Sequence, residues 1–339
     1  MARYGVLLTA FGAPERLDAV ESFMRNLMGR QPSEEAVASA KLRYLAIGGS
    51  SPLPAIAERI AAQLERELSG LPAVASSMRA VEGVKVPVAV GMCYSDPSVS
   101  TAVARLAAAG VRVIVWLSLS PFTSTVTTGA YRDAVEAAVG VTRGVRAVEA
   151  ASYRRAPGFV EFLAKQVIEA THKVDILRKR ALIVFTAHSL PLADIERDRS
   201  YVDQLRETVA DVAAGAGLGE ASGFDALPGI EAFGGPGVTA PWLLAFQSKG
   251  ARPCAWLGPD LDDVIDAAAA KSYDAVVVCP VGFVTDHMET LYDLDVLAAD
   301  RAMVAGMEFA RTSVPNDDVR MITALADAVR AVAPGRTPA

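Results

Sequence analysis

Short runs of branched and aromatic residues alternate along this chain with segments of helical composition, and this alternation constrains the fold more than any other feature. The spacers in the second half include predicted helices at 200–214 and 260–270. Apolar runs separated by helices of this length are typical of parallel sheets built from right-handed βαβ units, so we predict the α/β class. The predicted strands are 4–10, 86–91, 111–117, 145–148, 181–185, 243–246 and 275–279.

The length of the chain predicts two domains. A chain of 339 residues is too long for one ordinary core and suits two α/β domains of about 150 residues each. The motif ASYRRAPGF, at 151–159, marks the crossover, so we predict domains at 1–155 and 156–339, with a C-terminal helix free to pack back on the first. The segment 215–238, rich in Gly, Ala and Pro, is predicted to be a surface loop.

Composition and missing motifs exclude several function classes. The net charge of -6 and the lack of a basic cluster argue against nucleic acid as a partner. Neither a signal peptide nor an apolar run of about 18 residues is recognisable, so we expect a cytoplasmic protein without a transmembrane segment. No GxGxxG follows the first strand and no GxxxxGK[ST] occurs, so dinucleotide and P-loop sites lack their signatures.

The three cysteines give no sign of a disulfide or of a zinc site. Cys93, Cys254 and Cys279 lie far apart and form no CxxC pair. Neither a disulfide framework nor a zinc site is therefore indicated.

The stretch TAHSLP, 186–191, is the first candidate for a functional site. It follows the apolar run 181–185 and places His188 where a parallel strand turns towards the next helix, the end of the sheet at which ligands bind. A histidine there is about as often a turn residue or a satisfied core group, and the residues alone leave this open. His287 follows another predicted strand, so two strand ends predict one shared site.

The segment DHMETLYDLD, 286–295, is unusually acidic. If it is helical from Asp286 onward, Asp286, Glu289 and Asp293 fall at i, i+3 and i+7 and share one face. A solvated acidic face is the alternative. Carboxylates beside a histidine suit proton removal and a divalent cation such as Fe²⁺, and with three histidines in the chain we expect any metal to be a passing substrate.

Six motifs in order and register resemble the ferrochelatase family over about residues 4–330. They are LLTAFGAPE, IGGSSPLP, VGMCYSDP, TAHSLP, AFQSKG with WLGP, and GFVTDHMETLYDLD. The resemblance implies insertion of Fe²⁺ into a porphyrin by two Rossmann-like domains. Each would hold a four-stranded parallel sheet flanked by helices, with the active-site cleft between the domains.

The resemblance also implies roles for individual residues. His188 matches the essential histidine and Glu289 the carboxylate that faces it, so both are expected to be catalytic. His188, Glu289 and Asp293 are expected to handle the metal. Phe11, Leu53, Tyr94 and Trp256 match positions that wall the cleft, and the hydroxyl groups expected to bind propionates are Ser51, Ser120, Thr123 and Ser248.

The chain departs from the family pattern at a few positions. Cys93 replaces an arginine or lysine that could hold a propionate, and Leu297 stands where another carboxylate often follows Asp293. Some members bind a [2Fe-2S] cluster with four cysteines, whereas this chain has three, so we expect no cluster and no permanent cofactor.

The alanine-rich composition and DHMETLYDLD resemble actinobacterial members, which implies coproporphyrin III as substrate and coprohaem III as product. We expect a monomer. Three alternatives stay open: a protoporphyrin IX ferrochelatase, a cobalt or nickel chelatase for sirohydrochlorin-type rings, and a porphyrin or haem carrier that has lost turnover.

Overall fold

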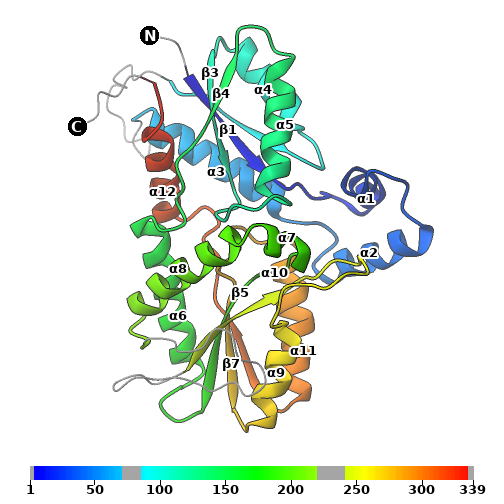
Figure 1. Cartoon of the computed structure of the whole chain (residues 1–339), viewed down its shortest axis with the longest axis vertical. Helices are drawn as coiled ribbons and strands as arrows, with labels where there is room; N and C mark the ends of the chain where they lie inside the picture. Colours follow the sequence, from blue (N-terminus) through cyan, green and yellow to red (C-terminus); the bar gives the residue numbers. More distant parts are fainter. Residues whose placement is uncertain (1–3, 71–84, 220–240, 335–339) are drawn as a thin grey trace. The chain divides into compact units, whose positions relative to one another are not determined.

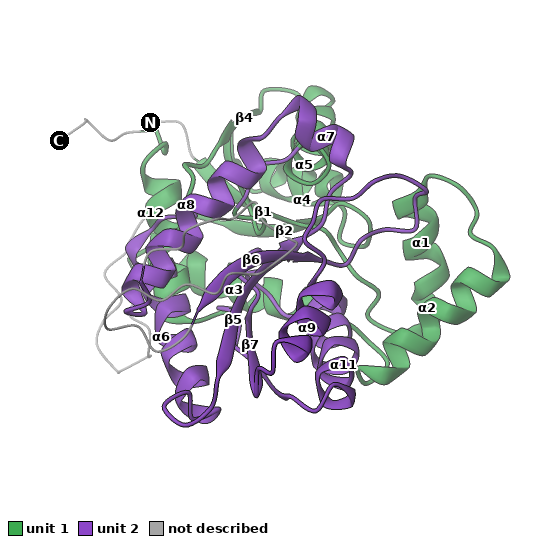
Figure 2. Ribbon diagram, turned by 60° about the horizontal axis from the view of Figure 1, so that its bottom comes forward, with its two compact units in different colours: residues 1–121, 125–153, 316–339 green, residues 122–124, 154–315 purple. Residues whose placement is uncertain are grey.

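A computed structural model describes residues 4–70, 85–219 and 241–334, and the chain forms two compact units (Figures 1 and 2). Unit 1 comprises 1–121, 125–153 and 316–339, and unit 2 comprises 122–124 and 154–315. The predicted division into domains at 1–155 and 156–339 concerns segments that fold independently, and it stays a prediction. Most of the loop predicted at 215–238 lies outside the described residues.

Unit 1 holds a four-stranded parallel sheet in the order β2-β1-β3-β4. Helices α4 and α5 cover one face, while α3 and α12 pack together on the other (Figure 1). The strands are β1 (Tyr4–Ala10), β2 (Val88–Met92), β3 (Val113–Ser118) and β4 (Arg146–Glu149). The helices are α1 (Val20–Met28), α2 (Glu34–Ala46), α3 (Leu53–Leu68), α4 (Val99–Ala108), α5 (Thr128–Gly140) and α12 (Val319–Arg330).

Unit 2 repeats this topology with a parallel sheet in the order β6-β5-β7-β8. Helices α6 and α8 lie on one face, and α9 and α11 cover the other (Figure 1). The strands are β5 (Ala181–His188), β6 (Trp242–Gln247), β7 (Ala275–Cys279) and β8 (Glu308–Arg311). The helices are α6 (Pro157–Lys173), α7 (Leu192–Arg197), α8 (Ser200–Gly215), α9 (Leu261–Ala270), α10 (Met288–Leu291), a π-helix (Asp293–Ala298) and α11 (Ala299–Val304).

The sequence patterns account for these elements. The central strands β5 and β7 are apolar along most of their length because helices cover both faces of the sheet. Helices begin at residues that bind their first amides, as where the Ser98 hydroxyl accepts the Thr101 N–H at the start of α4 and the Asp260 carboxylate accepts the Asp262 N–H at α9. The predicted α/β class and the pair of four-stranded parallel sheets are confirmed.

Two of the differences from the predicted strands matter for the site. The strand predicted at 181–185 continues through Thr186 and Ala187 to His188, because β6 remains paired with it as far as Gln247. Strand β8 was missed, since its four residues EFAR carry a charge at each end and lack an apolar run. Among the described helices, none has both the length and the hydropathy needed to cross a bilayer.

Gly282 permits a close approach of the loop after β7 to the end of β5. Its amide donates to the Thr186 carbonyl at 3.0 Å, and a Cβ at this position would lie 2.6 Å from the Ala187 Cβ. We therefore expect Gly282→Ala to lower the free energy of unfolding of unit 2 by about 2 kcal/mol, within the range for overpacked cores.

Urea and thermal unfolding of this variant measure the effect, and Gly140→Ala is the matched control. Gly140 lies at the end of α5, and a Cβ added there would have no neighbouring atom within 4 Å. The control should be neutral or stabilising by up to about 1 kcal/mol. Equal stability of the two variants would contradict the close packing at Gly282.

Candidate active site

The candidate site lies where β5 and β7 end side by side in unit 2. In a sheet of order 2-1-3-4, the connections that leave the two central strands pass to opposite faces, and this switch point is where open α/β sheets bind ligands. His188 is the last residue of β5, and the segment after β7 carries Glu289. Both strand ends expected from the sequence therefore meet at one edge.

His188 and Glu289 form the centre of the site. The His188 Nε2 lies 3.4 Å from the Glu289 Oε1, and the two side chains are 30% and 33% exposed, so both can reach a ligand. On the other side of the ring, Nδ1 lies 2.5 Å from the Ser189 carbonyl oxygen. Because a carbonyl oxygen only accepts, Nδ1 must carry the hydrogen, and Nε2 is the basic nitrogen of the neutral ring.

The surroundings of His188 raise the basicity of its imidazole. Burial by itself would lower the pKa of the imidazole, but the charge and hydrogen bond of Glu289, the Ser189 carbonyl and the charge of Asp293 together raise it above the ordinary value of 6.5. The Tyr201 hydroxyl donates to the His188 carbonyl at 2.9 Å and anchors the backbone of this strand end. His188 is therefore a fixed proton acceptor beside a carboxylate.

The end of strand β6 and the residue after it contact both acidic residues of the site, one through its backbone and one through its carboxylate. The Gln247 Nε2 donates to the Glu289 carbonyl at 2.7 Å, and the Ser248 Oγ donates to the Asp293 Oδ2 at 2.5 Å. Ser248 adopts a left-handed backbone conformation with φ of 59°, which is uncommon for a residue with a side chain. Gln247, which the sequence analysis missed, ends a strand in the same way as His188, and that position was the available signal.

His287 does not enter the site as a second base would. Its Nδ1 accepts the Glu289 N–H at 3.2 Å, so His287 caps α10, and its ring packs edge-on against Phe283 at 5.2 Å. Burial lowers the pKa of His287 below its ordinary value of 6.5, although the charges of Glu289 and Asp286 act in the opposite direction. The imidazole shapes the backbone that carries Glu289.

The prediction that Asp286, Glu289 and Asp293 share one face of a regular helix was wrong. Helix α10 begins at Met288, so Asp286 precedes the helix, because the Thr290 hydroxyl accepts the His287 N–H and completes a capping box. The chain then becomes π-helical, with the Leu297 N–H donating to the Tyr292 carbonyl at 2.9 Å.

The acidic residues are consequently divided between two environments. Asp286 faces Arg311 at 3.3 Å, whereas the charges of Glu289 and Asp293 both act on His188. Across 4–70, 85–219 and 241–334, no three His, Cys, Asp or Glu side chains gather in a ready-made metal site.

In unit 1, an aromatic cluster follows the ends of β1 and β2. The Phe11 ring lies 4.7 Å from the Tyr94 ring and 6.3 Å from Phe23 of α1, and all three are partly exposed. Neighbouring Cys93, like Phe11, packs against the core under α4 and α5, and burial raises the pKa of its thiol to about 12. Cys93 is therefore neutral and supplies no positive charge in place of the arginine or lysine that the resemblance led us to expect there.

The other predicted binding residues differ in exposure. Ser51 and Leu53 are 5% and 3% exposed, and the Ser51 Oγ accepts the Leu53 N–H at the start of α3. Thr123 is exposed and Ser120 half-buried. Trp256 is half-buried and pairs with Pro191, three residues beyond the end of β5 at His188.

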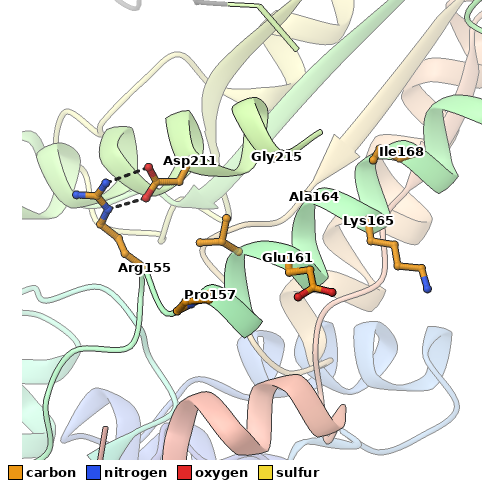
Figure 3. A pocket seen from close by; sticks show the side chains of 9 residues that line it. Arg155, Pro157, Glu161, Ala164, Lys165, Ile168, Asp211 and Gly215 are labelled. Atoms are coloured by element: carbon orange, nitrogen blue, oxygen red, sulfur yellow. Dashed lines mark hydrogen bonds and ion pairs between the residues drawn. The ribbon is translucent and has the colours of Figure 1, made fainter. Parts of the chain in front are cut away.

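A separate cavity of about 530 Å³ opens in unit 2 between α6 and α8 (Figure 3). Its walls are largely apolar, including Val160, Ala164 and Ile168, and the ion pair of Arg155 with Asp211 lies at its rim. Its lining contains none of the residues of the candidate site, so the cavity is distinct from that site.

Comparison with known proteins fits this arrangement. A family model described as ferrochelatase matches residues 3–333. The chain belongs to the ferrochelatase family. Ferrochelatases act on ferrous iron and a porphyrin, and the family predicted from the six motifs is confirmed.

Curated relatives match this ferrochelatase over nearly its whole length. A coproporphyrin III ferrochelatase of Bacillus subtilis is 30% identical over 330 residues, covering 96% of this chain and 97% of its own. A protein of the same name from Geobacillus kaustophilus is 30% identical over 328 residues, with coverage of 96% and 94%. A ferrochelatase of Herpetosiphon aurantiacus is 29% identical over 327 residues, with coverage of 96% and 97%.

Solved structures support the fold. CbiX, described as the terminal enzyme of sirohaem biosynthesis in denitrifying bacteria, superposes with a TM-score of 0.52 at 14% identity, covering 97% of this chain and 99% of its own. SirB from Bacillus subtilis gives 0.50 at 11% identity, with coverage of 98% and 96%. At such identities the likeness concerns the fold alone.

The capping role of His287 leads to a stability prediction. His287→Asn and His287→Ala both lose the ring contact with Phe283, but only asparagine accepts a backbone N–H well as an N-cap residue. We expect the alanine variant to be less stable than the asparagine variant by about 1 kcal/mol, measured by thermal unfolding. Indistinguishable melting temperatures would contradict the capping role.

Proposed function

We propose that this chain inserts Fe²⁺ into coproporphyrin III and forms coprohaem III. The observation that carries the proposal is the His188 Nε2 held 3.4 Å from Glu289 at the switch point of unit 2. The names of the 30% identical relatives, which match over nearly the full length, support the choice of porphyrin.

His188 and Glu289 provide the acid–base chemistry of the proposed reaction. When a divalent ion enters the ring, two N–H bonds break, the lone pairs of all four ring nitrogens bind the ion, and two protons leave. Nε2 accepts one proton because Nδ1 is committed to the Ser189 carbonyl, and the adjacent carboxylate stabilises the resulting imidazolium. Glu289 passes the second proton on to water and so remains the carboxylate that stabilises the imidazolium.

The same pair is suited to hand over the metal. The His188 Nε2 and the Glu289 Oε1 lie 3.4 Å apart, so these two side chains would hold Fe²⁺ together before it enters the ring. Asp293, which Ser248 orients, adds a negative charge behind them. We propose His188, Glu289 and Asp293 as the residues that handle iron.

Substrate recognition is assigned to the residues expected from the sequence. Phe11, Tyr94, Leu53 and Trp256 would contact the apolar faces of the macrocycle, and Ser51, Ser120, Thr123 and Ser248 its propionates. The exposed Thr123 is suited to this role, whereas Ser51 and Leu53 are buried and would act through their backbone or after rearrangement.

We further propose a monomer of the cytoplasm without a permanent cofactor. Three cysteines are one short of the four that a [2Fe-2S] cluster takes in some relatives. Burial also raises the pKa of Cys279 to about 12, which disfavours the thiolate that binds metals.

Anaerobic stopped-flow absorbance with Fe²⁺ tests the proposed function, using coproporphyrin III and protoporphyrin IX in parallel. We expect turnover with coproporphyrin III to exceed that with protoporphyrin IX, and His188→Ala to abolish insertion while porphyrin binding persists. Faster turnover with protoporphyrin IX would reassign the substrate. Binding of both porphyrins without insertion would indicate a carrier.

Glu289 and Asp293 should have different kinetic signatures. Glu289 faces the basic nitrogen, so Glu289→Gln should lower kcat by about 100-fold, as expected for the loss of a general base or its partner. Asp293 is held further back by Ser248, so Asp293→Asn should mainly raise the KM for Fe²⁺. Steady-state kinetics with each substrate varied give both values, and identical signatures would contradict the division of roles.

Ser248→Ala separates two roles for this hydroxyl. If it orients Asp293, as the 2.5 Å hydrogen bond indicates, its loss should raise the KM for Fe²⁺ in the same direction as Asp293→Asn. If it binds a propionate, the KM for coproporphyrin III should rise instead. Ser248→Gly controls for the backbone, since glycine adopts the left-handed conformation without strain.

A further inference from the structure

Arg311 lies outside every motif that pointed to the site, yet it touches the segment that carries Glu289 at two places. It is the last residue of β8, paired in register with Val278 of β7, and its side chain is 14% exposed. A guanidinium with this little exposure needs fixed acceptors.

Three groups satisfy it. The Arg311 Nε and Nη2 donate to the two oxygens of Asp295 at 2.6 and 2.8 Å, and Nη1 donates to the Thr312 carbonyl at 3.2 Å. Nη1 also lies 3.3 Å from the Asp286 Oδ1. A bidentate pair fixes orientation as well as distance, which a single-point contact with lysine would not do.

The carboxylates of Asp286 and Asp295 lie at the two ends of the segment 286–295, which carries Glu289. Asp286 accepts a hydrogen bond from the Thr290 hydroxyl at 3.1 Å, so Arg311 reaches the capping box at the start of α10 through Asp286. Asp295 lies in the π-helix, beyond Asp293. One buried cation therefore fixes both ends of 286–295, with Glu289 and Asp293 between them.

The same contacts divide the four carboxylates of the segment into two pairs. Four carboxylates lie within ten residues, and those of Asp286 and Asp295 are paired with Arg311. Glu289 and Asp293 are directed instead to His188 and Ser248. Without the cation, four neighbouring negative charges would repel one another, and Asp286 and Asp295 would compete for a divalent ion.

We propose that Arg311 is a positioning residue for iron insertion, which holds 286–295 so that Glu289 faces His188 and keeps Asp286 and Asp295 from binding the metal. This inference rests on the proposed function for its kinetic consequence. The role in holding the segment is independent of that function.

Hydrogen–deuterium exchange of the purified chain tests the structural part without any substrate. We expect Arg311→Gln to speed exchange of the amides in 286–298 by about 10-fold and to leave α8 unchanged, since local opening follows the loss of local contacts. In Arg311→Lys, the exchange rate of these amides should lie between that of the unaltered chain and that of Arg311→Gln. Arg301→Gln is the matched control, because Arg301 also clamps two carboxylates, Asp262 and Asp266, at the surface between α9 and α11.

Kinetics with Fe²⁺ and coproporphyrin III test the positioning role. Arg311→Gln should lower kcat by about 10-fold and leave the KM for the porphyrin within about 2-fold, with partial recovery in Arg311→Lys. If Arg311→Gln fails to fold, Asp295→Asn, which removes the bidentate acceptor, should show the same changes with smaller amplitude.

Unchanged exchange in both Arg311→Gln and Asp295→Asn would overturn the proposal, as would a changed porphyrin KM with normal kcat. Absence of insertion by the unaltered chain would refute the proposed function, while exchange would still decide whether Arg311 holds the segment.

Discussion

The register of β5 between β6 and β7 is the constraint on which the site depends. It places His188 opposite Gln247, while the β7 pairing sets where the chain leaves the sheet before Glu289. Parallel strands have their carboxyl ends at one edge, so three segments distant in sequence deliver side chains to the same place. A shift of one residue would turn His188 to the other face of the sheet.

At this edge of the sheet, hydrogen bonds fix the orientation of the His188 ring and of the backbone that carries Glu289. The Ser189 carbonyl fixes the tautomer of His188, Gln247 holds the backbone of Glu289, and His287 caps the short helix that presents it. Such contacts contribute modestly to net stability, but they fix the groups that we propose to react before a substrate arrives. Much of the chemistry assigned to two residues thus depends on neighbours that need not touch the substrate.

Much of this could be predicted from the sequence. Alternating apolar runs identified the sheets, and the strand end at His188, together with the motif that contains Glu289, named the two residues whose side chains lie 3.4 Å apart in the candidate site. The π-helix could not be predicted, because a switch from i+4 to i+5 hydrogen bonding leaves no strong periodic signal over six residues. Arg311 was missed because its partners Asp286 and Asp295 are neighbours only after β8 has joined the sheet.

The central claim is that Glu289 makes His188 a stronger base than burial alone would allow. The chain has only three histidines, so the His188 imidazole can be assigned by NMR with single substitutions and titrated in metal-free protein. Burial disfavours the charged ring and the carboxylate favours it, so the pKa should exceed 6.5 in the unaltered chain and fall clearly in Glu289→Gln. A pKa at or below 6.5, or one that Glu289→Gln leaves unchanged, would contradict the account.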